Sequence, residues 1–461
     1  MERRIKRVHF VGVGGIGMCG LAELLSGQGY QVSGSDLREG PTIARLRSLS
    51  IPVSIGHSAA QVGDANVVVY SSAVRRSNPE LLEAERRKIP VIPRAEMLAE
   101  VMRLKDGIAV AGSHGKTTTT SLIAHLLDAA GLDPTAIIGG RVLVPGRDPS
   151  TTRQGGGDLV VAEADESDGS FLRLAPVIAV VTNIDPEHLD HYGSFEALKN
   201  AFAEFANRVP FWGATILCLD HPGVQAILPQ TTRRIVSYGT TSQADWVATD
   251  LVRDGTGVRF AVRLRGTLLG HARLQLPGHH NVLNALAALA VAHELEVPFD
   301  RAARALDSFV GIERRFELKG EVAGVRVVDD YGHHPAEIRA TLAAARSVHE
   351  GRILVAFQPH RYTRTRDLWD DFVTAFNEAD ELLLCEIYAA GEDKLPHVEA
   401  GRLVEAISAH GHRNAAFVAD LDDVLDRLAE RAEPGDLVLT LGAGSISSLG
   451  ARLVERLGER A

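Results

Sequence analysis

The sequence predicts an α/β fold with three domains. Short β-branched runs end abruptly in Gly, Ser, Asp or His, and a helical pattern follows each run, which is typical of parallel α/β layers. These runs fall into three blocks along the 461 residues, and 45% of the residues are apolar, enough for about three cores. We expect the domains to span residues 1–106, 107–313 and 314–461.

Ten runs are predicted strands of these sheets. They are residues 8–11, 31–34 and 66–70 in the first block, 108–111, 159–162 and 177–181 in the second, and 325–328, 353–357, 382–384 and 437–441 in the third. Residues 234–265 instead alternate around a turn at 254–257, which predicts antiparallel hairpins that extend the central sheet.

Composition limits the classes of protein that fit. A net charge of −10 argues against a nucleic-acid binder held by electrostatics. Cys19, Cys218 and Cys385 match no metal or redox spacing, and no apolar run reaches the roughly 18 residues of a membrane span. We therefore expect a soluble cytoplasmic protein without disulfides, with no nucleic-acid or membrane partner.

Residues 112–120 read GSHGKTTTT between a predicted strand and a helical stretch at 121–130. Backbone N–H groups at a helix N-terminus favour an anion, Lys116 can reach terminal phosphates, and the Thr117 hydroxyl can bind Mg2+. Val110 stands where a phosphate loop usually has its first Gly, so a Gly-rich turn that only caps the helix stays an alternative. We expect Lys116 to be exposed, so that its loss stops turnover without unfolding the chain.

Acidic residues follow the next two predicted strands, at 163–168 and 182–191. Because Mg2+ takes carboxylate, phosphate and water oxygens, Thr117 with one of Glu163, Asp165 or Glu166 is a plausible site. A solvated acidic turn is the alternative. A zinc site of Asp185, His188 and His191 matches no known ligand spacing.

Asn281 and Asn284 lie three residues apart at the start of an Ala-rich helical stretch. Their amides could read both edges of a nucleotide base, or Asn281 could cap the helix.

The first block contains GVGGIG at 12–17, which fits GxGxxG after a strand, and Asp36 follows the next strand. Both features are typical of a Rossmann-like nucleotide site. A diphosphate-linked sugar can bind to the same kind of glycine-rich turn. A nicotinamide oxidoreductase is the alternative, but it leaves the phosphate loop and the third block without a role.

Arginines and histidines gather in the third block, at 313–317, 329–335 and 358–366. Arg361, Arg364 and Arg366 stand at a predicted helix start, where the helix dipole disfavours cations, so an anion-binding role competes with a solvated helix face.

Together these motifs resemble the Mur ligase family. The resemblance rests on GVGGIGM at 12–18, GSHGKTTT at 112–119, EADESD at 163–168, TNIDPEHLDHYG at 182–193, HNVLNALAA at 280–288, RRFE at 314–317, DDYGHHP at 329–335, FQPHRYTRT at 357–365 and GAGSI at 442–446. Nine motifs in order cover nearly the whole chain.

The resemblance implies Rossmann-like first and third domains around a central ATP-binding domain. It implies a monomeric or weakly dimeric ligase that uses ATP and Mg2+ to join L-alanine to the lactyl carboxylate of UDP-N-acetylmuramate, in the peptidoglycan synthesis that supports cell shape and division. A sister ligase that attaches a murein peptide to the same sugar is the alternative, and the 357–365 motif favours the single amino acid.

The resemblance also assigns site residues. The catalytic residues would be Lys116, His188, Arg315 and His333, and the metal ligands Thr117, Glu163 and His188. ATP would contact Gly112, Ser113, His114, Gly115, Lys116, Thr117, Thr118, Asn281, Asn284, Arg315 and Asp330. The substrates would contact Gly12, Gly14, Gly15, Asp36, Ser71, Ser72, Arg94, Tyr331, His333, Arg361 and Arg364. Residues 141–157 depart from the family pattern and receive no substrate contact, and Lys199 is not at the spacing of the modified lysine of some relatives.

Overall fold

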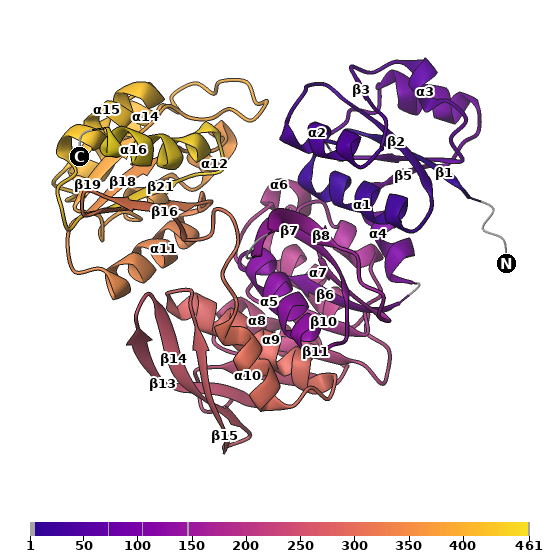
Figure 1. Ribbon diagram of the computed structural model, residues 1–461, viewed down its shortest axis with the longest axis horizontal. Coiled ribbons are helices and arrows are strands. Elements are labelled where there is room, and N and C mark those ends of the chain that lie inside the picture. The colour runs from indigo at the N-terminus through magenta and orange to yellow at the C-terminus, as the bar shows by residue number, and fades with distance from the viewer. Residues whose placement is uncertain (1–4, 72, 104, 145–146, 460–461) are drawn as a thin grey trace. The chain divides into compact units, whose positions relative to one another are not determined.

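The computed structural model describes residues 5–459, apart from 72, 104, 145 and 146. It contains three sheets flanked by helices, which confirms the three-domain α/β prediction (Figure 1). The chain packs as two compact units. The first comprises Met1–Asp250, Phe260–Ala272 and Leu283–Phe309, and the second Leu251–Arg259, Arg273–Val282 and Val310–Ala461.

The first sheet has the order β3-β2-β1-β4-β5, and all its strands are parallel. Its strands are β1 (Arg7–Val11), β2 (Gln31–Asp36), β3 (Val53–Ile55), β4 (Val67–Tyr70) and β5 (Val91–Pro93). The helices are α1 (Ile16–Gly27), α2 (Pro41–Ser48), η1 (Ala59–Val62), α3 (Pro79–Arg86) and α4 (Arg94–Met102). Because β1 is central, the glycine-rich turn after it lies at the middle of the carboxyl edge.

The second sheet is mixed and has ten strands in the order β15-β14-β13-β12-β11-β10-β6-β9-β7-β8. The strands are β6 (Asp106–Ala111), β7 (Thr135–Val144), β8 (Arg147–Arg153), β9 (Leu159–Glu163), β10 (Ile178–Val181), β11 (Ala214–Cys218), β12 (Ile235–Gly239), β13 (Trp246–Asp254), β14 (Gly257–Leu264) and β15 (Thr267–Leu274). The helices are α5 (Lys116–Ala129), η2 (Ser170–Arg173), α6 (Leu189–Tyr192), α7 (Phe195–Ala206), α8 (Pro222–Ile227), η3 (Leu228–Gln230), α9 (His279–Glu294) and α10 (Phe299–Asp307).

The third sheet has the order β16-β17-β21-β18-β19-β20, and only its edge strand β16 runs antiparallel. The strands are β16 (Glu317–Val322), β17 (Val325–Asp330), β18 (Ile353–Phe357), β19 (Glu381–Leu384), β20 (Ala415–Phe417) and β21 (Leu437–Leu441). The helices are α11 (Pro335–Val348), α12 (Tyr362–Asp367), α13 (Trp369–Val373), α14 (Ala400–Ala409), α15 (Leu421–Arg431), η4 (Ser445–Ser448) and α16 (Leu449–Gly458).

All ten predicted strands are present within a residue or two at their ends. The predicted hairpin extension is confirmed for β13 and β14, which are neighbours in the sheet and are joined by Gly255 and Thr256 alone. For the first part of that stretch, the prediction of an antiparallel hairpin is wrong. Strand β12 runs parallel to β11, because α8 and η3 carry the chain back between them.

Within 141–157, which received no role from the sequence, residues 141–144 end β7 and residues 147–153 form β8, and these two strands form an antiparallel hairpin. This hairpin packs on helix α1 of the first domain. Glu23 of α1 accepts bonds from Arg45 at 2.8 Å and from the Thr152 hydroxyl at 3.2 Å, and Arg45 also reaches the Ser150 hydroxyl. A Cβ at Gly20 would lie 2.6 Å from Thr152 Cγ2, so the close approach needs glycine. The hairpin therefore joins the first domain to the central sheet.

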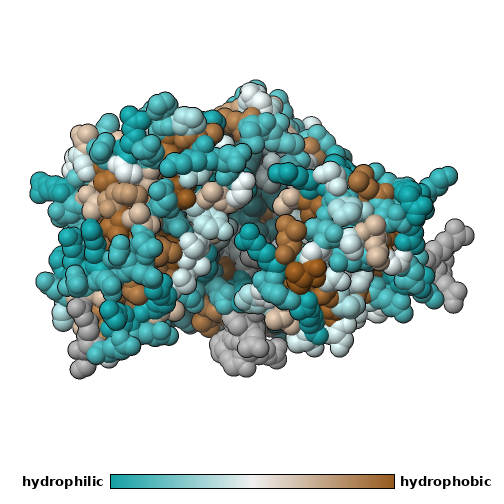
Figure 2. Space-filling model, turned by 90° about the horizontal axis from the view of Figure 1, so that it is seen from above, coloured by the Kyte–Doolittle hydropathy of each residue, from teal (hydrophilic) through white to brown (hydrophobic). Residues whose placement is uncertain are grey.

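Cys19, Cys218 and Cys385 are buried and free. Burial raises the pKa of Cys19 and Cys218 to about 11 and of Cys385 to about 12. Among the described helices none is long and apolar enough to cross a bilayer. Hydrophilic residues predominate on the face seen in Figure 2, with apolar ones scattered among them.

Trp246 tests the packing of the central domain. It is 1% exposed and its ring packs edge-on against His293. We expect Trp246→Ala to lower the free energy of unfolding by about 3–5 kcal/mol, because it leaves a large cavity. Trp212 is 58% exposed, so Trp212→Ala should change it by less than about 0.5 kcal/mol. Urea titration followed by circular dichroism measures both, and equal effects would contradict this packing.

Candidate active site

Three polar turns meet at the carboxyl edge of the central sheet. Strand β6 pairs in parallel with β10 on one side and with β9 on the other. The register sets Ala111 opposite Val181, and Val110 opposite Glu163. The phosphate loop after β6 is therefore flanked by the acidic turn after β9 and by the turn after β10, the place where open α/β sheets bind ligands.

The loop is built for close backbone approach. Gly112 and Gly115 have φ values of 139° and 80°, which favour glycine. A Cβ at Gly112 would overlap the Thr182 hydroxyl, and one at Gly115 would lie 2.7 Å from Asn284 Oδ1. Asn183 Oδ1 accepts a hydrogen bond from the His114 N–H at 2.7 Å. The turn after β10 thus fixes the loop, and α5 begins at Lys116 directly behind it.

Lys116 does not extend into solvent, and the expectation of an exposed lysine is wrong. Its side chain is 18% exposed, because the acidic turn after β9 folds over it. Its Nζ lies 2.8 Å from Glu166 Oε2 and donates to the carbonyls of Gly112 and Ser113. Burial opposes the ammonium charge, but Glu166, Asp165 and Glu187 outweigh it and raise the pKa of Lys116.

Glu166 is the buried partner of this lysine. Its side chain is 2% exposed, and the Tyr192 hydroxyl donates to its backbone carbonyl at 2.6 Å. Burial raises the pKa of Glu166 to about 7, against the attraction of Lys116. The pair places a basic and an acidic group at the mouth of the phosphate loop.

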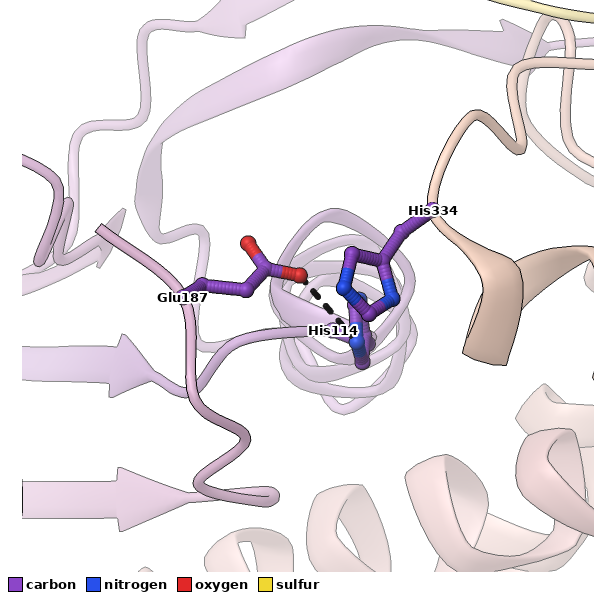
Figure 3. A group of neighbouring side chains, drawn as sticks. All are labelled: His114, Glu187 and His334. Atoms are coloured by element: carbon purple, nitrogen blue, oxygen red, sulfur yellow. Dashed lines mark ion pairs between the residues drawn. The ribbon is translucent and has the colours of Figure 1, made fainter. Parts of the chain in front are cut away.

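His114 of the loop faces the turn after β10. Its Nε2 lies 3.2 Å from Asp185 Oδ2 and 3.3 Å from Glu187 Oε1 (Figure 3). Asp185 also accepts from His221 at 3.3 Å. Burial disfavours the charged Asp185 carboxylate, but His114 and His221 stabilise it and hold the pKa of Asp185 well below its usual range.

A metal-binding group lies beside the loop. The ligand atoms of Glu166, Glu187 and His188 all lie within 4.8 Å of one another. Two carboxylates suit Mg2+, although the imidazole is a softer ligand. His188 belongs both to this group and to the set predicted from the sequence. Among the described residues, Asp185, His188 and His191 form no such group, so the zinc alternative has no support.

The other two predicted metal ligands lie on either side of the loop. Glu163 ends β9, and its Oε1 accepts from the Gly139 N–H at 2.7 Å. Thr117 is the second residue of α5 and is 9% exposed, and Thr118 follows it.

Both asparagines at the start of α9 are 6% exposed. Asn284 Oδ1 accepts from the Thr119 hydroxyl at 3.1 Å and packs against Gly115, so it borders the loop. Asn281 is the third residue of α9 and its Nδ2 donates to the Pro277 carbonyl at 2.7 Å. It is therefore not the residue that caps this helix.

The first domain presents its own glycine turn. Gly12 has a φ of 78°, and Gly15 precedes the first residue of α1. Asp36 accepts a hydrogen bond from the Gly14 N–H at 2.8 Å, so in this structure its carboxylate braces the turn. The N–H of Ser71 donates to the Val11 carbonyl at 3.2 Å. Ser72 lies outside the described residues.

Arg94 links the first domain to the acidic turn. Its Nη2 lies 3.0 Å from Asp165 Oδ2, next to the glutamate that holds Lys116. A Cβ at Gly17 would lie 2.7 Å from Arg94 Nη1, so the arginine crosses α1 over a glycine. Arg94 was predicted to meet the sugar, and its side chain reaches from α1 to the acidic turn.

In the third domain, the predicted residues after β17 pack together. Asp330 is 6% exposed and accepts from the N–H groups of Phe316 and Gly332, and burial raises its pKa to about 6. The Arg315 guanidinium lies 5.2 Å from the Tyr331 ring centroid and 3.5 Å from Glu337. His333 packs edge-on against Tyr331.

Residues after β18 join this group. The His360 ring lies 5.6 Å from that of His333 and stacks on Tyr388, also at 5.6 Å. Arg364 reaches His360 Nδ1 at 3.3 Å, and the Arg361 N–H donates to the Tyr388 carbonyl. Burial, His333 and the two arginines lower the pKa of His360 to about 4. The cluster thus combines permanent cations with a neutral imidazole.

The sequence analysis assigned no role to several of these residues. Glu166 stood only as one of three alternatives, and Glu187 and His360 lay inside quoted motifs without a role. A polar position directly after a predicted strand is the signal that could have found them. Tyr388 follows β19 by four residues, and nothing in the sequence indicates its stacking.

Fold and site together define a phosphate-loop α/β enzyme whose nucleotide site borders a second, glycine-rich domain. Three family models match the chain: "Mur ligase family, catalytic domain" at residues 7–106, "Mur ligase middle domain" at 110–292, and "Mur ligase, glutamate ligase domain" at 314–444. The chain belongs to the Mur ligase family, whose members are ATP-using ligases.

Known relatives cover almost the whole chain. It is 57% identical to the UDP-N-acetylmuramate–L-alanine ligase of Sorangium cellulosum, over 98% of this chain and 97% of that one. The UDP-N-acetylmuramate-alanine ligase structure of Thermotoga maritima superposes with a TM-score of 0.83 at 30% identity, covering 99% and 100%. A murein peptide ligase of Psychrobacter arcticus gives 0.72 at 26%, covering 98% of both. These matches favour a ligase over the nicotinamide oxidoreductase.

The Lys116–Glu166 pair leads to a prediction on the phosphate loop. Lys116→Ala should stop turnover, because the loop then lacks the ammonium group that meets the terminal phosphates. It should also lower the free energy of unfolding by about 1–3 kcal/mol, because Glu166 loses its charge partner and stays buried as a protonated acid without the hydrogen bond from Lys116.

The double variant Lys116→Ala/Glu166→Gln separates the two effects. We expect it to regain most of the lost stability and none of the activity, measured by urea denaturation and by ADP release. Recovery of turnover in the double variant would remove Lys116 from the chemistry.

His360 leads to a prediction on pH. Its pKa in the folded chain is about 4, below its ordinary value of 6.5, so the unfolded chain binds more protons between these two values. Stability from this group therefore rises with pH across that window and is complete above it. The difference in free energy of unfolding between wild type and His360→Asn should grow by about 1 kcal/mol from pH 4 to 6.5, after allowance for solvent screening. It should stay constant between pH 7 and 8, and a slope there, or none below, would contradict the buried neutral ring.

Proposed function

We propose that this chain joins L-alanine to the lactyl carboxylate of UDP-N-acetylmuramate, with conversion of ATP to ADP and phosphate. The observation that carries the proposal is identity of 57% with a UDP-N-acetylmuramate–L-alanine ligase along the full chain. The phosphate loop with its buried Lys116 supports it independently, because a ligase of this kind must bind a triphosphate.

The proposed reaction has two steps. The lactyl carboxylate oxygen attacks the γ-phosphorus of ATP, and the bond between the γ-phosphorus and the β,γ-bridging oxygen breaks. ADP departs as the leaving group, and the sugar carries an acyl phosphate. The amino group of L-alanine then attacks the acyl carbon, loses a proton and expels phosphate, which leaves an amide. Lys116 and the backbone N–H groups of the loop hold the phosphates while charge shifts to the leaving oxygen.

We propose Mg2+ as the metal. Thr117, Glu163 and His188 stay its predicted ligands, and Glu166 and Glu187 lie close enough to His188 to take part. Bound there, the ion would neutralise charge on the transferring phosphoryl group. Carboxylate oxygens fit a hard cation of this kind.

The substrate residues follow the three domains. We propose that Gly12, Gly14, Gly15, Asp36, Ser71, Ser72 and Arg94 face the UDP-sugar, that Asn281, Asn284, Arg315 and Asp330 contact ATP, and that Tyr331, His333, Arg361 and Arg364 serve the amino acid and the muramoyl group. The boundaries at 106 and 313, the cytoplasmic location and the monomeric or weakly dimeric state stay predictions.

ADP release with UDP-N-acetylmuramate, ATP and Mg2+ tests the proposal, with each of the twenty amino acids offered in turn. We expect release with L-alanine, its loss on adding EDTA, and its return with excess Mg2+. Replacing L-alanine by a murein tripeptide is the decisive comparison. Release that depends on the peptide and not on L-alanine would identify the sister ligase, and no release with any acceptor would contradict both.

A further inference from the structure

A buried acid with two histidines lies beneath the glycine turn of the first domain. Glu80 is fully buried, His9 is 1% exposed, and the His57 side chain is 12% exposed. None of these three residues belongs to the sites described above. A carboxylate is rarely buried unless several groups compensate its charge.

Glu80 has such partners on every side. Its Oε2 lies 2.6 Å from His9 Nε2 and accepts from the Ser35 hydroxyl at 2.9 Å. Its Oε1 lies 2.7 Å from His57 Nδ1. His9 in turn bonds to the Ser33 hydroxyl through Nδ1. Burial opposes the charge, but the bonds from His9, His57 and Ser35 lower the pKa of Glu80, so it is an ionised centre of this network.

The network ties together the elements that carry the sugar-facing turns. His9 lies in β1, Ser35 is the second-last residue of β2, His57 follows β3, and Glu80 is the second residue of α3. Asn78 precedes α3 and caps it by accepting from the Glu80 N–H. The Glu80 side chain therefore ties α3 to β1, to β2 and to the turn after β3.

Ser35 connects the Glu80 network to the glycine turn after β1. Its carbonyl accepts from the N–H groups of Gly12 at 2.9 Å and Val13 at 3.0 Å, while its hydroxyl holds Glu80. The next residue, Asp36, accepts from the Gly14 N–H and, through its carbonyl, from Gly56. The glycine turn is thus hydrogen-bonded to the end of β2, and Glu80 holds that end of β2 in position.

We infer that Glu80, with His9, His57 and Ser35, forms a positioning network that sets the glycine turn of the first domain for the UDP-sugar. The inference rests on the proposed function. These residues do not touch the reacting atoms, so their loss should weaken binding of UDP-N-acetylmuramate and leave ATP binding and the chemical steps unchanged.

Steady-state kinetics of the full chain test it, with ADP release as the readout and L-alanine and Mg2+ saturating. The variants are Ser35→Ala, His57→Gln and Glu80→Gln, and calorimetry gives the Kd of UDP-N-acetylmuramate without ATP. We expect KM and Kd for the sugar to rise about tenfold in Glu80→Gln and His57→Gln, equal to about 1.4 kcal/mol, and less in Ser35→Ala. KM for ATP and kcat should stay within about twofold, which a loss of folded enzyme would not produce.

Asn66→Ala is the matched control. Asn66 accepts from the N–H groups of Lys6 and Arg7, at the opposite end of β1 in the same domain. It should lower stability without moving the KM for the sugar. Ser35→Ala removes a single hydroxyl, so it decides the question if Glu80→Gln does not fold.

Two failures are distinguishable. A wild-type enzyme that releases no ADP with these substrates contradicts the proposed function. A wild-type enzyme that reacts normally, with variants whose KM for the sugar is unchanged or whose kcat alone falls, overturns the positioning network and leaves the proposed function intact.

Discussion

The parallel pairing of β6 with β9 and β10 is the constraint on which the site depends. It brings the phosphate loop, the acidic turn and the turn after β10 to one edge, and the Lys116–Glu166 pair then closes that edge. A buried ammonium and a buried carboxylate are each costly alone, so each holds the other in place. Shifting either neighbouring strand by one residue would turn the side chains of that strand to the other face of the sheet and displace the turn that follows it.

The pair also satisfies the hydrogen-bond donors of the lysine. Lys116 satisfies its donors with Glu166 and with the carbonyls of Gly112 and Ser113. In the proposed function, a triphosphate would compete for those same donors, and the freed carboxylate lies in the group with Glu187 and His188. One exchange of partners would thus prepare both the phosphate and the metal positions.

The sequence predicted most of the architecture, because buried parallel strands are runs of β-branched residues and all ten such runs are strands. Strands β3, β5 and β20 are only three residues long and gave no such signal. The β7–β8 pairing was missed because residues 141–157 carry prolines and polar residues without a clear alternation, whereas their packing on α1 is a tertiary contact.

Within the site, residue type and position after a strand located the loop, the acidic turns and the third-domain cluster. What they could not supply was the partner of each side chain. Lys116 was expected in solvent because its burial depends on a turn that is 50 residues away along the chain. Asp36 was predicted to meet the UDP-sugar, and its bond to the Gly14 N–H was not anticipated. Both outcomes depend on tertiary contacts that no local pattern encodes.

The hairpin of β7 and β8 has a further consequence. Through Glu23, Arg45 and Thr152 it fastens α1, which starts at the glycine turn, to the sheet that carries the phosphate loop. The orientation of the glycine turn relative to the phosphate loop is then set when the chain folds. In the proposed function, ATP and the UDP-sugar are two anions that repel one another. If their sites are already oriented, binding them needs no further ordering of these protein segments. The loss of rotational and translational freedom of the two substrates would then be the main entropic cost.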